Sequence, residues 1–103
     1  MIRLIEQSRP RLTELCGQFH VRRLDIFGSA TRADQFVPET SDLDFLVEFL
    51  ETDAMNPADQ YFGLLAELER LFGRRVDLVS AKALRNRYFI KSVEATREAL
   101  YAA

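Results

Sequence analysis

Mostly apolar residues gather in three short runs, which is the pattern of β-strands. The runs cover residues 24–27, 45–49 and 74–79; the first two are mostly apolar, and the third opens with two arginines and has Asp77 between its apolar residues. β-branched and aromatic side chains are frequent in them, as is usual for strands that are packed in a core. We therefore predict three strands.

The residues before the first strand show helical spacing of apolar positions. Within residues 2–18 and just after them, this set comprises Ile2, Ile5, Leu12, Leu15, Cys16 and Phe19. A helix is the prediction for this segment. Pro10 interrupts it and either kinks the helix or stands in the first turn of a new one.

Three more helices are predicted farther along the chain. The clearest covers residues 57–72, because Asn56 is a favourable N-cap, Pro57 suits the first helical position and Gly73 is a typical stop. Its apolar stripe contains Tyr61, Leu65, Leu68 and Phe72, widened by Phe62 and Leu64, and indicates core packing. A short helix is predicted for residues 81–84 and a longer one for residues 89–100.

These elements predict one α/β (α+β) domain over residues 1–103, with a small mixed sheet flanked by helices on one side. The length lies near the usual size of one domain, and the hydrophobic share of 48% is enough for a core.

Composition excludes several functions. The formal net charge of −2 disfavours a free-standing nucleic-acid binder, and no apolar run approaches the length of a membrane span. Cys16 is the only cysteine and His20 the only histidine, so a zinc site of such ligands and an internal disulfide are both excluded. We expect a cytoplasmic protein without membrane contact.

The chemistry is concentrated where the first strand ends and the second begins. Gly28-Ser29 follows the first strand directly, and a glycine turn lets backbone N–H groups and a hydroxyl approach an anion such as phosphate. Asp42 and Asp44 lie two positions apart, so on a strand their carboxylates share a face and can hold Mg²⁺. The stretch predicts phosphoryl or nucleotidyl transfer.

Each half of this pattern also has a simpler interpretation. Gly-Ser turns are common, and an Asp-x-Asp pair is more often a solvated strand edge or a helix cap. The combination is more informative, because aspartate is depleted in strands and Asp42 and Asp44 open an otherwise apolar run.

The motif resembles a known family. Gly28-Ser29, Arg32 and Ser41-Asp42-x-Asp44, with the hydrophobic strands around them, are similar to the minimal nucleotidyltransferase (MNT) domain of the DNA polymerase β superfamily. Ala33 departs from the pattern, because the family usually has glycine after the arginine. The resemblance implies a polymerase-β-like fold and a place among the HEPN/MNT toxin–antitoxin systems.

It also implies roles for individual residues. Asp77 interrupts the third strand, and its position resembles that of the superfamily's third carboxylate. The implied set is Asp42, Asp44 and Asp77 as catalytic and metal-binding residues, and Gly28, Ser29, Arg32 and Ser41 as the binding site for ATP. The alternatives are a surface aspartate on an edge strand for Asp77, and an ion pair of Arg32 with Asp34 or Glu39.

The function expected from the resemblance is an Mg²⁺-dependent transfer of AMP from ATP to a tyrosine of a HEPN ribonuclease toxin. One alternative is an antitoxin that only binds its toxin, and another is a small-molecule nucleotidyltransferase. A homo-oligomer is compatible with the sequence, and no direct contact with nucleic acid is expected. We also expect an exposed aromatic region at Tyr88, Phe89 and Tyr101 to need cover from a partner chain.

Overall fold

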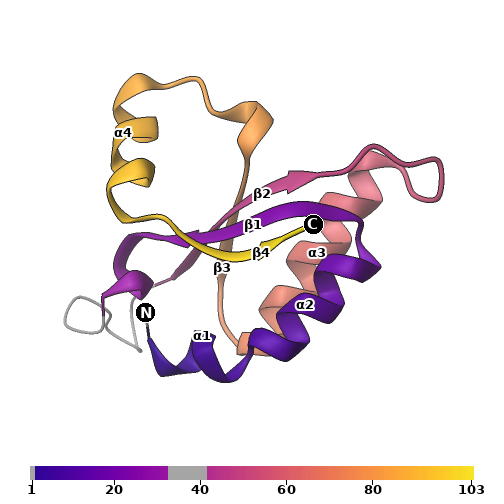
Figure 1. Ribbon diagram of the computed structural model, residues 1–103, viewed down its shortest axis with the longest axis horizontal. Helices are drawn as coiled ribbons and strands as arrows, with labels where there is room; N and C mark the ends of the chain where they lie inside the picture. The colour runs from indigo at the N-terminus through magenta and orange to yellow at the C-terminus, as the bar shows by residue number, and fades with distance from the viewer. Residues whose placement is uncertain (1, 33–41) are drawn as a thin grey trace.

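A computed structural model describes residues 2–32 and 42–103 of the chain. In chain order its elements are α1 (Arg3–Gln7), α2 (Arg9–Gln18), β1 (Val21–Phe27), the 3-10 helix η1 (Gly28–Thr31), β2 (Leu43–Phe49), α3 (Pro57–Phe72), β3 (Val76–Ser80), the 3-10 helix η2 (Ala81–Ala83), α4 (Arg87–Thr96) and β4 (Glu98–Ala102). Figure 1 shows their arrangement.

The strands form one mixed sheet in the order β3-β2-β1-β4. β1 pairs antiparallel with both β2 and β4, whereas β2 pairs parallel with β3. A parallel pair needs a long crossover, and α3 supplies it between β2 and β3. The predicted mixed sheet with flanking helices is confirmed.

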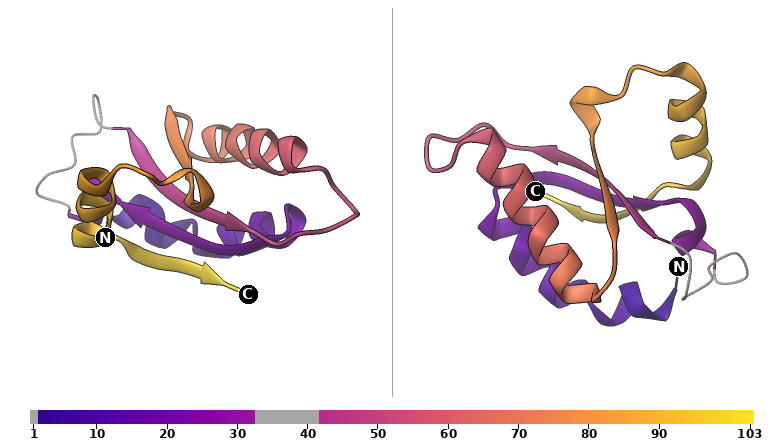
Figure 2. Two further views of the ribbon diagram at one scale, coloured as in Figure 1. Left: turned by 90° about the horizontal axis from the view of Figure 1, so that it is seen from above. Right: turned by 180° about the vertical axis from the view of Figure 1, so that it is seen from behind.

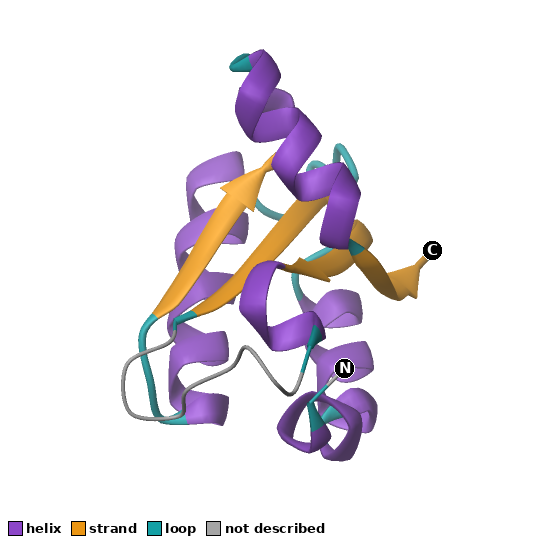
Figure 3. Cartoon of the chain, turned by 90° about the vertical axis from the view of Figure 1, so that its left-hand side faces the viewer, coloured by secondary structure: helices purple, strands orange, loops and turns teal. Residues whose placement is uncertain are grey.

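The two faces of the sheet are covered differently. Residues such as Ile26, Phe45 and Leu78 belong to the main core, which they share with α1, α2 and α3. Phe27 and Leu46 point to the opposite face and form a second small core with Val93 of α4. Helices therefore lie on both sides of the sheet (Figures 1 and 3), and the expectation of helices on one side is wrong for α4.

The N-terminal segment consists of two separate helices, not one kinked helix. The first helix ends at Gln7, and Pro10 stands in the first turn of the separate helix α2. Cys16 is fully buried on α2, and burial raises the pKa of its thiol to about 12, so it is an inert core residue. Figure 2 shows α2 and α3 on the same side of the sheet.

Helix α3 begins and ends as its sequence predicts. Asn56 Oδ1 accepts a hydrogen bond of 2.8 Å from the N–H of Asp59, and Gly73 ends the helix in the left-handed region at φ 61°. One part of the predicted apolar stripe is wrong, because Phe62 is 64% exposed.

The C-terminal segment differs from the prediction. The helix expected over residues 89–100 is α4, which ends at Thr96, and residues 98–102 form the edge strand β4 instead. Tyr101 lies on that strand opposite Leu24 and packs against the main core, so it is not part of an exposed aromatic region.

The longest helix of the described residues is α3, with 16 residues. No helix in this described part is long and apolar enough to cross a membrane.

Candidate active site

The predicted carboxylates lie at one end of the sheet, on β2 and the edge strand β3 and just before β2. Phe27, the last residue of β1, lies opposite Asp44 on β2, and Asp44 lies opposite Asp77 on β3. Asp42 lies directly before β2, two positions from Asp44, and its charge acts on the Asp44 carboxylate. Asp44 is half-buried, while Asp42 and Asp77 are exposed at this end.

The Gly28-Ser29 turn lies directly beside this group. Gly28 has a φ of 77°, a left-handed conformation that only glycine adopts at little cost. A Cβ atom on Gly28 would come within 2.6 Å of Asp44 Oδ2. Glycine is therefore needed here both for the turn and for the close approach to the carboxylate.

The electrostatics of the group favour a bound cation. Burial, and then the negative charges of Asp77 and Asp42, raise the pKa of Asp44 to about 6. Carboxylates that repel one another in this way are stabilised in their ionised form by a divalent cation, and oxygen ligands suit Mg²⁺. Within residues 2–32 and 42–103, no three acidic, cysteine or histidine side chains already stand in a metal-binding arrangement. The carboxylate donor set nevertheless fits Mg²⁺, and the missing side chain at Gly28 lets Asp44 Oδ2 stand directly against the turn.

A cleft of about 480 Å³ lies between β3 and α3. Asp42, Asp77 and Arg75 line it together with Tyr61. The Tyr61 hydroxyl donates a hydrogen bond of 2.5 Å to the carbonyl oxygen of Leu78, and burial together with the charge of Asp77 raises its pKa. The sequence pattern indicated only a core role for Tyr61; its hydroxyl, which needs a polar partner when buried, was the missed signal.

Hydrogen bonds fix the turn from several directions. Thr31 Oγ1 donates to the carbonyl oxygen of Gly28 over 2.8 Å, and the N–H of Arg32 donates to the carbonyl oxygen of Ser29 over 3.1 Å. Ser29 itself is half-buried, and Arg32 is exposed at the end of η1. The N–H of Gly28 donates to Thr96 Oγ1 over 2.8 Å, so it is not available to a phosphate.

Four residues named in the sequence analysis belong to the segment 33–41. Ser41, Ala33 and the two carboxylates considered as partners of Arg32, Asp34 and Glu39, lie outside the described residues.

Two residues near the site were not predicted from the sequence. Asp25 is fully buried on β1, where its carboxylate accepts hydrogen bonds from Arg23 Nε (3.0 Å) and Arg97 Nε (2.7 Å). Thr96 contacts Gly28 from the last turn of α4. Asp25 carries the signal that singled out Asp44, a charged residue in an apolar strand run.

A mixed four-stranded sheet with a glycine turn and paired aspartates at one end is the arrangement expected of a nucleotidyltransferase. The chain belongs to the family described as polymerase beta, nucleotidyltransferase, whose model matches residues 11–103.

Known proteins of similar sequence support the enzyme class. "Putative protein adenylyltransferase MJ1379" of Methanocaldococcus jannaschii is 36% identical over 80 residues, which cover 78% of this chain and 77% of that protein. "Protein adenylyltransferase MntA" of Thermococcus cleftensis is 38% identical over 73 residues, with coverages of 71% and 69%. The chain is thus a homologue of protein adenylyltransferases.

A solved structure supports the fold. A chain in the complex of a tri-AMPylated Shewanella oneidensis HEPN toxin with an MNT antitoxin matches with a TM-score of 0.65 and 16% identity. The match covers 96% of this chain and 73% of that chain.

Proposed function

We propose that the protein is an antitoxin that transfers AMP from ATP to a tyrosine of a HEPN ribonuclease toxin, with Mg²⁺ as cofactor. The family and the homologous protein adenylyltransferases support the reaction type. The complex of an AMPylated HEPN toxin with an MNT antitoxin, which has the same fold, supports the class of acceptor.

One observation carries the proposal, namely the position of Asp44. It lies in register with Asp77, within close approach of the Gly28 turn, and two positions after Asp42. A group of carboxylates beside a turn that can hold phosphate supports nucleotidyl transfer, which depends on charge stabilisation at the phosphoryl oxygens.

The residues divide the work between them. Ser29 and the backbone of its turn hold the β- and γ-phosphates, with Arg32 at the end of the turn as a further cationic group. Asp42, Asp44 and Asp77 would hold Mg²⁺, which when bound would neutralise charge on the phosphates and lower the pKa of the attacking hydroxyl. Asp77 orients that hydroxyl and accepts its proton as the oxygen attacks the α-phosphorus of ATP.

The proposed reaction forms an O–P bond between the acceptor hydroxyl and the α-phosphorus, and breaks the bond from that phosphorus to the bridging oxygen. The AMP group stays on the acceptor, and pyrophosphate leaves. Such a step depends mainly on positioning and on stabilisation of the charge on the phosphoryl oxygens.

The test is transfer of labelled AMP from ATP to a purified candidate toxin, followed by mass spectrometry of the modified residue. Asp42→Asn and Asp44→Asn retain the side-chain shape but lose the charge, and we expect a rate loss on the order of 10³-fold. Ser29→Ala removes one donor and is expected to cost about 10²-fold. Asp53→Asn, in an exposed position between β2 and α3, is the matched control and is expected to leave the rate unchanged.

Two results would replace this proposal with a binding antitoxin. The first is no transfer by the wild-type protein to any partner that it binds. The second is protection of cells from the toxin by Asp42→Asn and Asp44→Asn equal to that by the wild-type protein. In both cases neutralisation would rest on contact alone.

A further inference from the structure

A residue far along the chain holds the backbone of the Gly28 turn. Thr96, the last residue of α4, accepts a hydrogen bond of 2.8 Å from the N–H of Gly28 with its Oγ1 atom. Sixty-eight positions separate the two residues. The contact therefore links the C-terminal helix to the turn at the end of β1.

The Thr96 hydroxyl is well suited to this contact. Its Oγ1 atom also lies 3.5 Å from the carbonyl oxygen of Ser92, to which it donates, so the hydroxyl both donates and accepts. Threonine has two χ1 rotamers in a helix, and the bond to the carbonyl of Ser92, four positions earlier, selects one of them. The acceptor is thereby held in one place opposite the N–H of Gly28.

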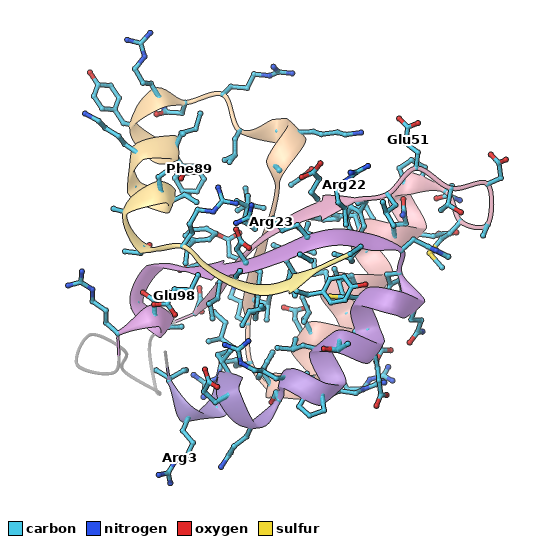
Figure 4. The ribbon with its side chains drawn as sticks, in the orientation of Figure 1. Arg3, Arg22, Arg23, Glu51, Phe89 and Glu98 are labelled. Atoms are coloured by element: carbon cyan, nitrogen blue, oxygen red, sulfur yellow. The ribbon has the colours of Figure 1, made fainter. Side chains whose placement is uncertain are left out.

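The helix that carries Thr96 is itself fixed by other contacts. Arg97, the next residue, pairs with the fully buried carboxylate of Asp25 on β1. Phe89 packs edge-on against Phe27 with a centroid distance of 6.0 Å, and Val93 is buried beside Phe27. In Figure 4, Phe89 lies on the side of α4 that faces the sheet. Removal of the Thr96 hydroxyl alone should therefore leave α4 in place.

What the hydrogen bond fixes is the orientation of the peptide group that leads into Gly28. That residue holds a φ of 77° and stands against the carboxylate of Asp44. A glycine loses more conformational freedom on ordering than any other residue, so a turn built on it benefits from an external anchor. Ser29 follows directly and depends on the same backbone orientation.

We propose that Thr96 is a positioning residue for the nucleotide: its hydroxyl anchors the N–H of Gly28 and so sets Ser29 and the turn in their place beside Asp44. This inference rests on the proposed role of the turn in holding the phosphates of ATP. It assigns α4 a part in nucleotide binding without any contact of Thr96 with the nucleotide.

The experiment compares three variants of the full chain. Thr96→Val has nearly the same shape without the hydroxyl, and Thr96→Ser keeps the hydroxyl. Thr52→Val is the matched control, because Thr52 Oγ1 also accepts a backbone N–H, that of Ala54 over 3.1 Å, in the segment between β2 and α3. Two quantities are measured: hydrogen exchange of the Gly28 amide by NMR, and the affinity for a non-hydrolysable ATP analogue with Mg²⁺ by calorimetry.

We expect Thr96→Val to speed up exchange at Gly28 and to weaken the ATP analogue about 10-fold, the size of one lost hydrogen bond. Thr96→Ser should restore most of the affinity, and Thr52→Val should change neither quantity. The melting temperature of Thr96→Val should stay close to that of the wild type, because Arg97 and Val93 still fix α4.

Three outcomes would overturn the inference: wild-type affinity in Thr96→Val, equal losses in Thr96→Val and Thr96→Ser, or no binding of the analogue by the wild-type protein. A Thr96-dependent affinity together with absence of AMP transfer to any protein would leave the inference standing and remove only the proposed acceptor. If Thr96→Val binds the analogue with wild-type affinity and transfers AMP at the wild-type rate, the role of Thr96 is refuted and the proposed function stands.

Discussion

Among single residues, Gly28 is subject to two constraints at once. Its backbone is left-handed, and the space where a side chain would begin is filled by a carboxylate oxygen of Asp44. Gly17 on α2 has neither constraint, since no atom lies within 4 Å of the place where its Cβ would stand. The two glycines therefore allow a direct comparison.

We predict that Gly28→Ala lowers the free energy of unfolding by about 1–2 kcal/mol, because an L-residue disfavours the left-handed region. The displaced Asp44 carboxylate should in addition weaken binding of an ATP analogue with Mg²⁺. Gly17→Ala, in a helix, should stabilise the protein by roughly 0.5–1 kcal/mol. Urea denaturation and calorimetry give the two quantities, and equal effects of both substitutions would contradict the assigned role of Gly28.

The candidate site was predicted from the local pattern where its residues lie close together in the chain, and Asp77 followed from the family resemblance. Gly28, Asp42 and Asp44 belong to one short stretch, and their spacing alone indicated the chemistry. Thr96 carries no such local signal, because its contact with Gly28 comes from another element. Asp25 does carry one, as a charged residue in an apolar strand run, but its pairing with Arg97 is a tertiary contact that a single sequence does not reveal.

Among the elements, β4 shows where periodicity misleads. Phe89, Val93, Thr96 and Leu100 continue a helical spacing, yet the chain turns into a strand after Arg97. Residues 98–102 form a strand because they pair with β1, where Ala99 lies opposite Asp25. Strand formation depends on such non-local partners more than helix formation does, so α3, with its local caps, was predicted correctly and β4 was not.

The ion pair between Arg97 and Asp25 lies where α4 is followed by β4, and we predict that it stabilises the fold. Arg97 contacts Asp25, whose side chain is fully buried, while the Arg97 side chain is 23% exposed. We predict that Arg97→Ala lowers the free energy of unfolding by about 3 kcal/mol, because the Asp25 carboxylate is left with Arg23 alone. Urea denaturation measures the loss.

The control is Arg11→Ala. Arg11 forms an exposed pair with Glu14 on α2, and its loss should cost less than about 1 kcal/mol. Equal costs for the two substitutions would mean that the Asp25–Arg97 pair does not anchor α4. A double replacement of Asp25 and Arg97 by leucine should recover part of the loss, because no buried charge then remains unpaired.

In the whole molecule, the main core and the candidate site lie in different parts of the sheet. One face packs against α1, α2 and α3 in the main core, whereas Asp44 alternates with core residues of β2 and lies on the opposite face, beside the Gly28 turn. Substitutions of Asp44 therefore remove charge without opening the main core. The outer surface of α4 belongs neither to the main core nor to the candidate site, and Tyr88 on it is 83% exposed.

This separation leads to the last prediction, on the partner. Tyrosine is enriched among the residues that dominate protein interfaces, and Tyr88 stands with Arg87 and Lys91 on the exposed side of α4. We predict that a co-expressed HEPN-type partner co-elutes with the wild-type protein and with Asp44→Asn on size exclusion. Tyr88→Ala should weaken that complex by about 30-fold or more, as expected for a central interface residue.

Phe62→Ala is the matched control, since Phe62 is a second exposed aromatic residue, on α3 at the other side of the sheet. It should leave the affinity for the partner unchanged. Separate elution of the wild-type protein and its partner at micromolar concentration would remove the main support for an antitoxin role. Loss of the complex in Asp44→Asn would show instead that the partner binds across the carboxylates, so that binding and chemistry are not separable in this small fold.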